Sequence, residues 1–117
     1  MGVVYYANYL VWFEIGRTDL LRRSGWSYRE MEADGLVLPV VEAHCAYRQS
    51  AKYDDELDIV TTGDLLSPVR VRFAYAVVRV RDGTTLADGY TVHASLNQLG
   101  KPCRLPDRVR AVFRESS

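Results

Sequence analysis

Two histidines and one pair of aspartates are the residue types that hydrolytic acid–base chemistry uses most often. Asp54 and Asp55 stand side by side before a strand pattern, where they could look like an acid–base pair of carboxylates. His44 and His93 each stand alone in a strand pattern. A lone histidine on a strand is more often structural, and aspartates at a strand start commonly form local turn hydrogen bonds. We therefore expect structural roles for all four side chains.

Other catalytic and cofactor motifs are absent from the sequence. There is no Gly-x-Ser-x-Gly elbow and no Ser-His-Asp order, and the stretch "GKP" at 100–102 is not a phosphate-binding loop. Cys45 and Cys103 are too few for a disulfide framework or a metal site, so we expect two reduced structural thiols. The sequence thus predicts no metal ion and no resident cofactor.

The stretch "ANYLVWFEIGRTDLLRRSG" (7–25) has the period of a helix, with Asn8 as a candidate N-cap and Gly25 in the C′ position. Spacings of three and four join the apolar positions Tyr9, Trp12, Phe13, Gly16 and Leu20, and the polar line is Glu14, Arg17, Thr18 and Arg22. The apolar surface is widened by Leu10, Val11, Ile15 and Leu21. We therefore expect this helix to be covered on more than one side. Gly16 costs about 1 kcal/mol relative to alanine inside a helix, so we expect it to allow another backbone to approach closely.

Alternating patterns predict the rest of the fold. Strands are expected at 36–50, 56–66, 69–81 and 85–97. The alternation changes phase near Val77–Val78, which predicts a bulge, and "RDGT" (81–84) predicts a hairpin turn. Short helices are expected at 27–35, where Ser27 and Glu30 form a capping box, and at 106–113, where Pro106 stands at the start.

This order of elements predicts one α+β domain over residues 1–117, with helices on one face of an antiparallel sheet. Fifteen basic side chains balance fifteen acidic ones, which gives no argument for nucleic acid or an acidic membrane surface as a partner. No apolar run is long enough for a membrane span, and the N-terminus lacks the pattern of a signal peptide. We therefore expect a cytoplasmic protein.

Three stretches, in this order, carry a resemblance to a known family: "GVVYYANYLVWFEIGRTDLLRRSG", "LPVVEAHCAYRQSAKYDDELDI" and "GKPCRLP". Together they resemble acyl-CoA thioesterases of the 4-hydroxybenzoyl-CoA thioesterase class, including those associated with the Tol–Pal envelope system. The resemblance covers nearly the whole chain. It implies the hotdog fold, in which an antiparallel sheet wraps around a long central helix.

The motif of that family reads Asp-x-x-Gly-Val-Val-Tyr, and a first strand precedes its aspartate. Gly2 and Val3 match the turn of the motif and are expected to contact substrate, while the position of the aspartate would precede Met1. We therefore expect that this chain lacks the family's first strand and catalytic aspartate. The resemblance assigns the backbone N–H of Tyr6 as donor to the thioester oxyanion, at a helix start where unpaired amides favour negative charge. From the residues alone, Tyr5 and Tyr6 could be packing aromatics.

The resemblance also suggests roles for one acid and four cations. Glu14 matches a position where relatives often carry an acid that faces the acyl pocket, so it could be a substitute general base or a pocket wall. An ion pair with Arg17 or a hydrogen bond to Thr18 would equally explain it. Coenzyme A carries phosphates, and the basic residues expected at the mouth of its tunnel are Arg70, Arg72, Lys101 and Arg104. A solvated sheet face explains the two strand arginines equally well.

The expected activity is hydrolysis of a short-chain or aromatic acyl-CoA to the free acid and coenzyme A, which enters only as part of the substrate. The alternative is a catalytically impaired hotdog protein that binds acyl-CoA or a protein partner. The resemblance implies a homodimer or homotetramer, paired through a strand near Leu38–Arg48, with the site between subunits. The acyl group and the choice between dimer and tetramer stay open at this point.

Overall fold

The structure of the chain is a computed structural model that describes residues 7–52 and 54–116. Three predicted site residues, Gly2, Val3 and Tyr6, lie outside the described residues. Along the chain the elements are α1 (Ala7–Arg23), α2 (Tyr28–Ala33), β1 (Val40–Tyr47), β2 (Leu57–Ser67), β3 (Arg70–Arg79), β4 (Thr85–Ala94) and α3 (Asp107–Ser116). The predicted α+β class is confirmed, since helices and an antiparallel sheet occupy separate stretches of the chain.

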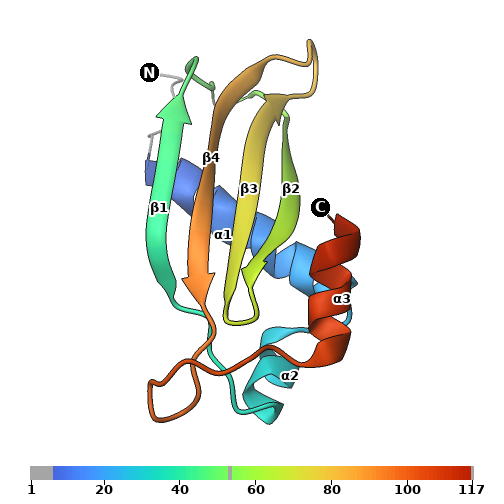
Figure 1. Cartoon of the computed structure of the whole chain (residues 1–117). Coiled ribbons are helices and arrows are strands. Elements are labelled where there is room, and N and C mark those ends of the chain that lie inside the picture. Colours follow the sequence, from blue (N-terminus) through green and yellow to red (C-terminus); the bar gives the residue numbers. More distant parts are fainter. Residues whose placement is uncertain (1–6, 53, 117) are drawn as a thin grey trace.

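The four strands form one antiparallel sheet in the order β1-β4-β3-β2, as Figure 1 shows. β2, β3 and β4 form a meander, and β1 lies beside β4 at an edge. The turn at Asp82–Gly83 joins β3 to β4, and Gly83 takes a φ of 72°, which glycine adopts without strain. The predicted bulge is confirmed, because the register between β3 and β4 shifts between Val77 and Val78.

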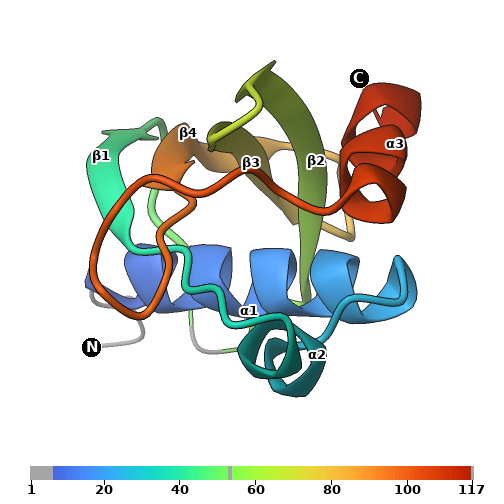
Figure 2. The same cartoon turned by 60° about the horizontal axis from the view of Figure 1, so that its bottom comes forward.

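Helix α1 lies across one face of the sheet, and the sheet curves over it (Figure 2). Alternate residues of a strand point to the same face. On β3 the residues of the helix-facing side are at most 3% exposed: Val71, Phe73, Tyr75 and Val77. Phe13 of α1 is fully buried against them. Burying a side chain of this size stabilises the fold by about 1.5–3 kcal/mol, so this contact anchors the helix.

The opposite side of α1 is left open by the described residues. Leu10, Val11 and Ile15 are 48%, 51% and 55% exposed. The prediction that this helix is covered on more than one side is therefore wrong for the described part of a single chain. The sheet curves in one direction only and reaches the side of α1 that carries Phe13, so a second cover would have to come from elsewhere.

Gly16 is the point of closest approach between α1 and β2. A Cβ atom added there would lie 2.4 Å from Thr61 Oγ1 and 3.0 Å from Ile59 Cγ2. The predicted close approach is confirmed, but the prediction of its partner is wrong. The neighbours are side chains of β2 and not another backbone, because β2 lays its inward side chains directly across the helix.

The two short helices close the end of the fold near the C-terminus of α1. Ser27 caps α2, since its Oγ accepts the N–H of Glu30 at 3.4 Å. α3 packs beside β2, where Phe113 lies over Gly63 so closely that an added Cβ would be 2.9 Å from the ring. Phe113 also meets the ring of Phe73 edge-on at 5.7 Å. The predicted final helix is thus confirmed, and it extends the core.

Candidate active site

The start of α1 is held by aromatic packing and by one hydrogen bond. Tyr9, in the first turns of the helix, is 3% exposed and meets the rings of Trp12 and Tyr47 at 5.0 and 5.2 Å. Its hydroxyl bonds the backbone of Ala51, and burial raises the pKa of this phenol. The N–H groups of a first helical turn lack intrahelical partners and favour negative charge. Aromatic packing and this hydrogen bond therefore hold the start of α1, which can stabilise an anion, near the end of β1.

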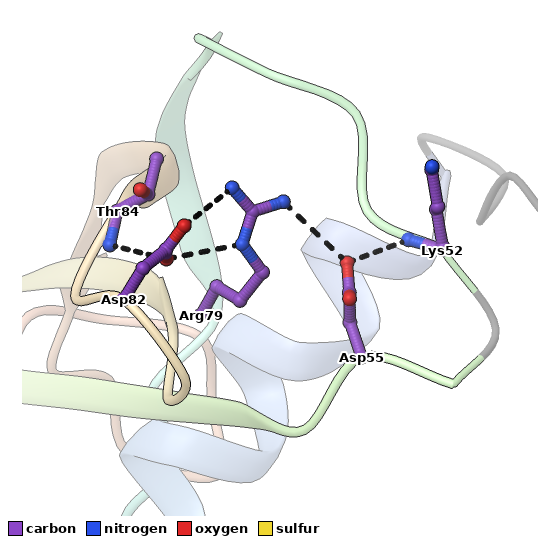
Figure 3. A network of polar contacts seen from close by, with 5 residues as sticks. All are labelled: Lys52, Asp55, Arg79, Asp82 and Thr84. Atoms are coloured by element: carbon purple, nitrogen blue, oxygen red, sulfur yellow. Dashed lines mark hydrogen bonds and ion pairs between the residues drawn. The ribbon is translucent and has the colours of Figure 1, made fainter.

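The loop before β2 is tied to the β3–β4 turn by the network in Figure 3. Asp55 Oδ2 accepts the N–H of Lys52 at 2.9 Å and lies 3.7 Å from Arg79 Nη1. Arg79 also donates to both carboxylate oxygens of Asp82, at 3.1 and 2.9 Å, and Asp82 accepts the N–H of Thr84. These donors hold the pKa of Asp82 well below its usual range. The network holds in place the loop that contains Ala51, whose backbone bonds the Tyr9 hydroxyl.

The expectation for the two aspartates of this loop is confirmed for Asp55, which makes local hydrogen bonds to Lys52 through both its side chain and its N–H. The ion pair with Arg79 was not predicted, because Arg79 is 24 positions further on and meets Asp55 only through the β2–β3 register, which places Leu57 opposite Arg79. Asp54 is exposed. Both aspartates therefore stand in a turn, and one of them braces it.

Glu14 lies on the open side of α1. It borders a groove of about 360 Å³ whose lining is Glu14, Ile15, Gly16, Thr18, Asp19, Arg22 and Ile59. No ion pair or hydrogen bond joins Glu14 to Arg17 or Thr18 among the described residues, so that alternative is not realised. Arg17 turns inward and donates to the hydroxyl of Tyr75 at 3.5 Å. The carboxylate of Glu14 is thus available to a ligand in the groove.

The two strand arginines lie on the sheet face that points away from α1. Arg72 alternates with the buried Val71 and Phe73, and its guanidinium carbon is 5.5 Å from the centroid of the Tyr90 ring. His44 stacks on Tyr90, with the two ring centroids 5.5 Å apart. His93, by contrast, is 2% exposed. Both histidines thus contact neighbouring side chains of the sheet, in keeping with the structural roles that the sequence predicts.

Lys101 and Arg104 lie in the exposed loop after β4. This loop starts at the end of the sheet where Ala94 pairs with Arg70, whereas Tyr47, beside the start of α1, pairs with Ala87. Seven positions along β4 separate those two pairs, or ~23 Å at ~3.3 Å per residue. Within one chain the fold therefore does not bring Arg70, Lys101 or Arg104 to the start of α1.

An apolar cavity of about 270 Å³ lies at the other end of α1, and its lining is Leu20, Leu21, Ser24, Gly25, Trp26, Arg108, Val109 and Phe113. Arg108 is already paired at 2.9 Å with Asp34, which also accepts the indole N–H of Trp26 at 2.7 Å. Those two donors hold the pKa of Asp34 below its usual value. The cavity thus offers apolar contact but no unpaired acid or base for hydrolysis, and we place the candidate site at the start of α1 instead.

A buried hydrogen-bond chain beneath α1 escaped the sequence interpretation. His93 lies 2.9 Å from the carbonyl oxygen of Leu38 through Nδ1 and 2.8 Å from Thr91 Oγ1 through Nε2. Thr91 Oγ1 lies 2.6 Å from the hydroxyl of Tyr75, and this hydroxyl accepts a hydrogen bond from Arg17. The only sequence signal is that Thr91 and His93 are two positions apart on a strand and so share a face. Their meeting with Tyr75 and Arg17 depends on register.

Neither a metal-binding cluster nor a helix able to span a membrane is found in the described part of the chain. No group of three or more histidine, cysteine, aspartate or glutamate side chains converges there as a metal site would require. Cys45 and Cys103 are separate free thiols. None of the helices of residues 7–52 and 54–116 has both the length and the hydropathy that crossing a bilayer requires.

Comparison with known proteins gives the family. Residues 1–113 match the model of the thioesterase-like superfamily. The chain belongs to this superfamily. A 55-residue segment of this thioesterase-like chain is 46% identical to the Bacillus subtilis protein YneP and covers 47% of the chain and 40% of YneP. The acyl-CoA thioesterase YbgC of Haemophilus influenzae is 31% identical over 96% of the chain and 82% of YbgC.

A solved structure supports the same conclusion for the fold. The DHNA-CoA thioesterase of Staphylococcus aureus superposes on this thioesterase-like chain with a TM-score of 0.82 and 31% identity, over 99% of the chain and 77% of that protein. The sheet and helices of Figure 1 are therefore those of a hotdog-like thioesterase fold. This agrees with the hotdog fold that the family resemblance implies.

Proposed function

We propose that this chain hydrolyses the thioester of a short-chain or aromatic acyl-CoA to the free acid and coenzyme A. The observation that carries the proposal is the fixed start of α1, where Tyr9 is buried and bonded to Ala51 in a chain of the thioesterase-like superfamily. Water attacks the thioester carbonyl, its oxygen becomes an oxyanion, and the carbon–sulfur bond then breaks to release the thiolate. The proposed donor to that oxyanion is the backbone N–H of Tyr6, next to the start of α1.

Distance along the helix favours one of the two roles considered for Glu14. Glu14 is seven residues beyond Ala7, where α1 begins, which corresponds to ~10 Å at ~1.5 Å per residue. A general base must lie within hydrogen-bond reach of the attacking water, itself in contact with the carbonyl carbon. We therefore assign Glu14 to the wall of the acyl pocket in its own subunit. In the family motif the base is an aspartate three positions before the glycine that Gly2 matches.

Pairing of two copies through β1 is the oligomer that we propose. β1 is an edge of the sheet, and Val40 and Val41 on it are 45% and 48% exposed. Two β1 strands related by a two-fold axis run antiparallel. The loop with Lys101 and Arg104 in one subunit then approaches the start of α1 in its partner. This arrangement would bring cations for coenzyme A phosphates to a site that a single chain leaves incomplete.

The donor role is tested by comparing Tyr6→Pro with Tyr6→Phe. Proline removes the backbone N–H, whereas phenylalanine keeps it and removes only the hydroxyl. Loss of one oxyanion donor lowers kcat by ~10²–10³-fold, so we expect that loss for Tyr6→Pro and little change for Tyr6→Phe. The assay is release of free thiol from acyl-CoA, by a form extended at its N-terminus with the family's strand and aspartate. Equal turnover of both variants would refute the donor role.

A non-catalytic acyl-CoA-binding protein is the remaining alternative, and the same preparation distinguishes it. Binding of acyl-CoA without thiol release in both the 117-residue chain and the extended form would favour that alternative. Turnover by the extended form alone would support hydrolysis with an aspartate base. A cytoplasmic location for this reaction is likewise a proposal, and it is consistent with coenzyme A thioesters as substrates.

A further inference from the structure

With a neutral His93 ring, the buried chain from Leu38 to Arg17 has only one consistent direction of donation. The carbonyl oxygen of Leu38 can only accept, so the Nδ1 of His93 carries the hydrogen in that 2.9 Å contact. On a neutral ring Nε2 is then an acceptor, and the Thr91 hydroxyl donates to it at 2.8 Å. Thr91 Oγ1 in turn accepts from Tyr75 at 2.6 Å, and Tyr75 accepts from Arg17. Every hydroxyl hydrogen in the chain is used once.

We propose that His93 is a positioning residue for α1: its neutral ring, with the hydrogen on Nδ1, sets the donor direction of a buried chain that ends on Arg17. Tyr75 is the link between this chain and the helix. Its ring stacks on the ring of Phe13, with centroids 4.3 Å apart. Its hydroxyl accepts a hydrogen bond from Arg17, which lies one helical turn beyond Phe13 on α1. The direction of the chain therefore decides whether Tyr75 presents an acceptor or a donor to α1.

A second proton on His93 reverses the chain. Both ring nitrogens then donate, so Thr91 must accept from Nε2 and turn its own hydrogen toward Tyr75. The Tyr75 hydrogen would in that case point at Arg17, which has donors only. Thr91 could instead accept from both neighbours, but its hydrogen would then lack an acceptor, since its described side-chain partners are only His93 and Tyr75. Either arrangement leaves one buried donor unpaired.

The groups around His93 offer no compensation for that charge. α1 presents the cation Arg17, and β3 presents Tyr75 and the Phe73 ring, which is perpendicular to His93 with centroids 5.2 Å apart. α2 presents Tyr28 toward Tyr75. The segment before β1 contributes only the Leu38 carbonyl oxygen. Among the described residues no carboxylate bonds or pairs with His93. Burial, and secondarily the charge of Arg17, lower the pKa of His93, while the Leu38 contact raises it.

The test is the protonation state and tautomer of His93, read from long-range ¹H–¹⁵N spectra of the ring. The chain has two histidines, and the exposed His44 gives the comparison signal in the same sample. We expect His93 at pH 7 to be neutral with its hydrogen on Nδ1. A ring protonated at Nε2, or a doubly protonated ring at pH 7, would overturn the proposal.

Tyr75→Phe tests whether the direction of the chain controls His93, because it keeps the stack on Phe13 and removes only the hydroxyl. The substitution removes the hydrogen bond from Tyr75 to Thr91, which orients the Thr91 hydroxyl toward Nε2 of the neutral ring. We therefore expect the midpoint of the His93 titration to rise by ~0.7 pH unit, which corresponds to the free energy of one hydrogen bond. Tyr90→Phe, on the other face of β4, is the matched control and should leave the midpoint in place. An unchanged midpoint in Tyr75→Phe would mean that His93 is only packed and not coupled.

An activity readout connects this inference to the proposed function, on which it rests only at this step. If α1 presents the oxyanion donor, kcat should fall on the acid side with the midpoint of His93, and Tyr75→Phe should move both together. An acid limb that stays in place while the NMR midpoint moves would overturn the positioning role. Absence of any turnover would instead count against the proposed function, since the spectra need no substrate.

Discussion

The ring of Phe13 on α1 lies flat on the ring of Tyr75 on β3, with centroids 4.3 Å apart and planes 5° from parallel. Phe13 is fully buried and Tyr75 is 3% exposed, so this pair is where helix and sheet are joined. We expect Phe13→Ala to lower the free energy of unfolding by about 3–5 kcal/mol, because it removes a buried ring and leaves a cavity. Denaturant unfolding measures it, with Phe113→Leu as a milder core control. A loss below about 1 kcal/mol would contradict the anchoring role.

Gly16 and Thr61 form the second contact between α1 and the sheet. We expect Gly16→Ala to destabilise the fold by about 1–3 kcal/mol, because the new methyl would meet Thr61 Oγ1 at 2.4 Å. Thr61 Oγ1 is itself buried with no hydrogen-bond partner among the described residues, so Thr61→Ala should cost little. The double variant should therefore recover most of the stability. Simple addition of the two single effects in this mutant cycle would show that the side chains do not collide.

Arg79 is expected to hold the loop before β2 through Asp55. Arg79→Gln removes the charge that pairs with both Asp55 and Asp82, and it should lower Tm and increase amide exchange in residues 51–56. Arg48→Gln is the matched control, because Arg48 pairs with Asp88 in an exposed position and should change neither quantity much. Equal effects of the two substitutions would mean that the network in Figure 3 does not stabilise this loop.

Stability should depend on pH through His93. The folded-state pKa of His93 lies below its ordinary value of 6.5, so the unfolded chain binds more protons as the solution is acidified. The contribution of the neutral ring is therefore complete above pH 6.5 and is lost as pH falls below that value. Urea unfolding between pH 7.5 and 5.5 should show this slope in wild type and in His44→Gln. The slope should vanish in His93→Gln, and its persistence there would assign it to another group.

Lys101 and Arg104 are expected to act on coenzyme A and not on the acyl group. The variant carrying Lys101→Gln and Arg104→Gln should raise KM for acyl-CoA by roughly tenfold or more, as loss of charge-assisted hydrogen bonds implies. The KM for the matching N-acetylcysteamine thioester, which has no phosphate, should not change. Arg23→Gln, an exposed cation at the opposite end of α1 from the proposed site, is the control. Equal loss with both substrates would contradict phosphate recognition.

The sequence predicts those parts of this fold that depend on residues close together in the chain. The Asp82–Gly83 turn, the bulge at Val77 and the final helix that begins after Pro106 each follow from local patterns, and each is present. The register of the strands is not local. For that reason the approach of Arg79 to Asp55, and the chain from His93 through Tyr75 to Arg17, could not be derived before the structure.

The open side of α1 shows a different limit of sequence patterns. Leu10, Val11 and Ile15 are apolar and therefore predicted a second cover for the helix, but the pattern does not say which molecule supplies it. The same holds for Glu14. Its type and position are compatible with a site acid, an ion pair with Arg17 or a hydrogen bond to Thr18. Among the described residues neither of the last two forms, and Arg17 turns inward to Tyr75 instead.

Thiol release from a panel of short-chain and aromatic acyl-CoAs tests the central claim most directly. The 117-residue chain is assayed beside a form extended at its N-terminus with a strand and the Asp-x-x-Gly motif. We predict clear turnover by the extended form and little effect of Glu14→Gln on that turnover. Thiol release at the buffer rate by both forms, on every acyl-CoA of the panel, would contradict it.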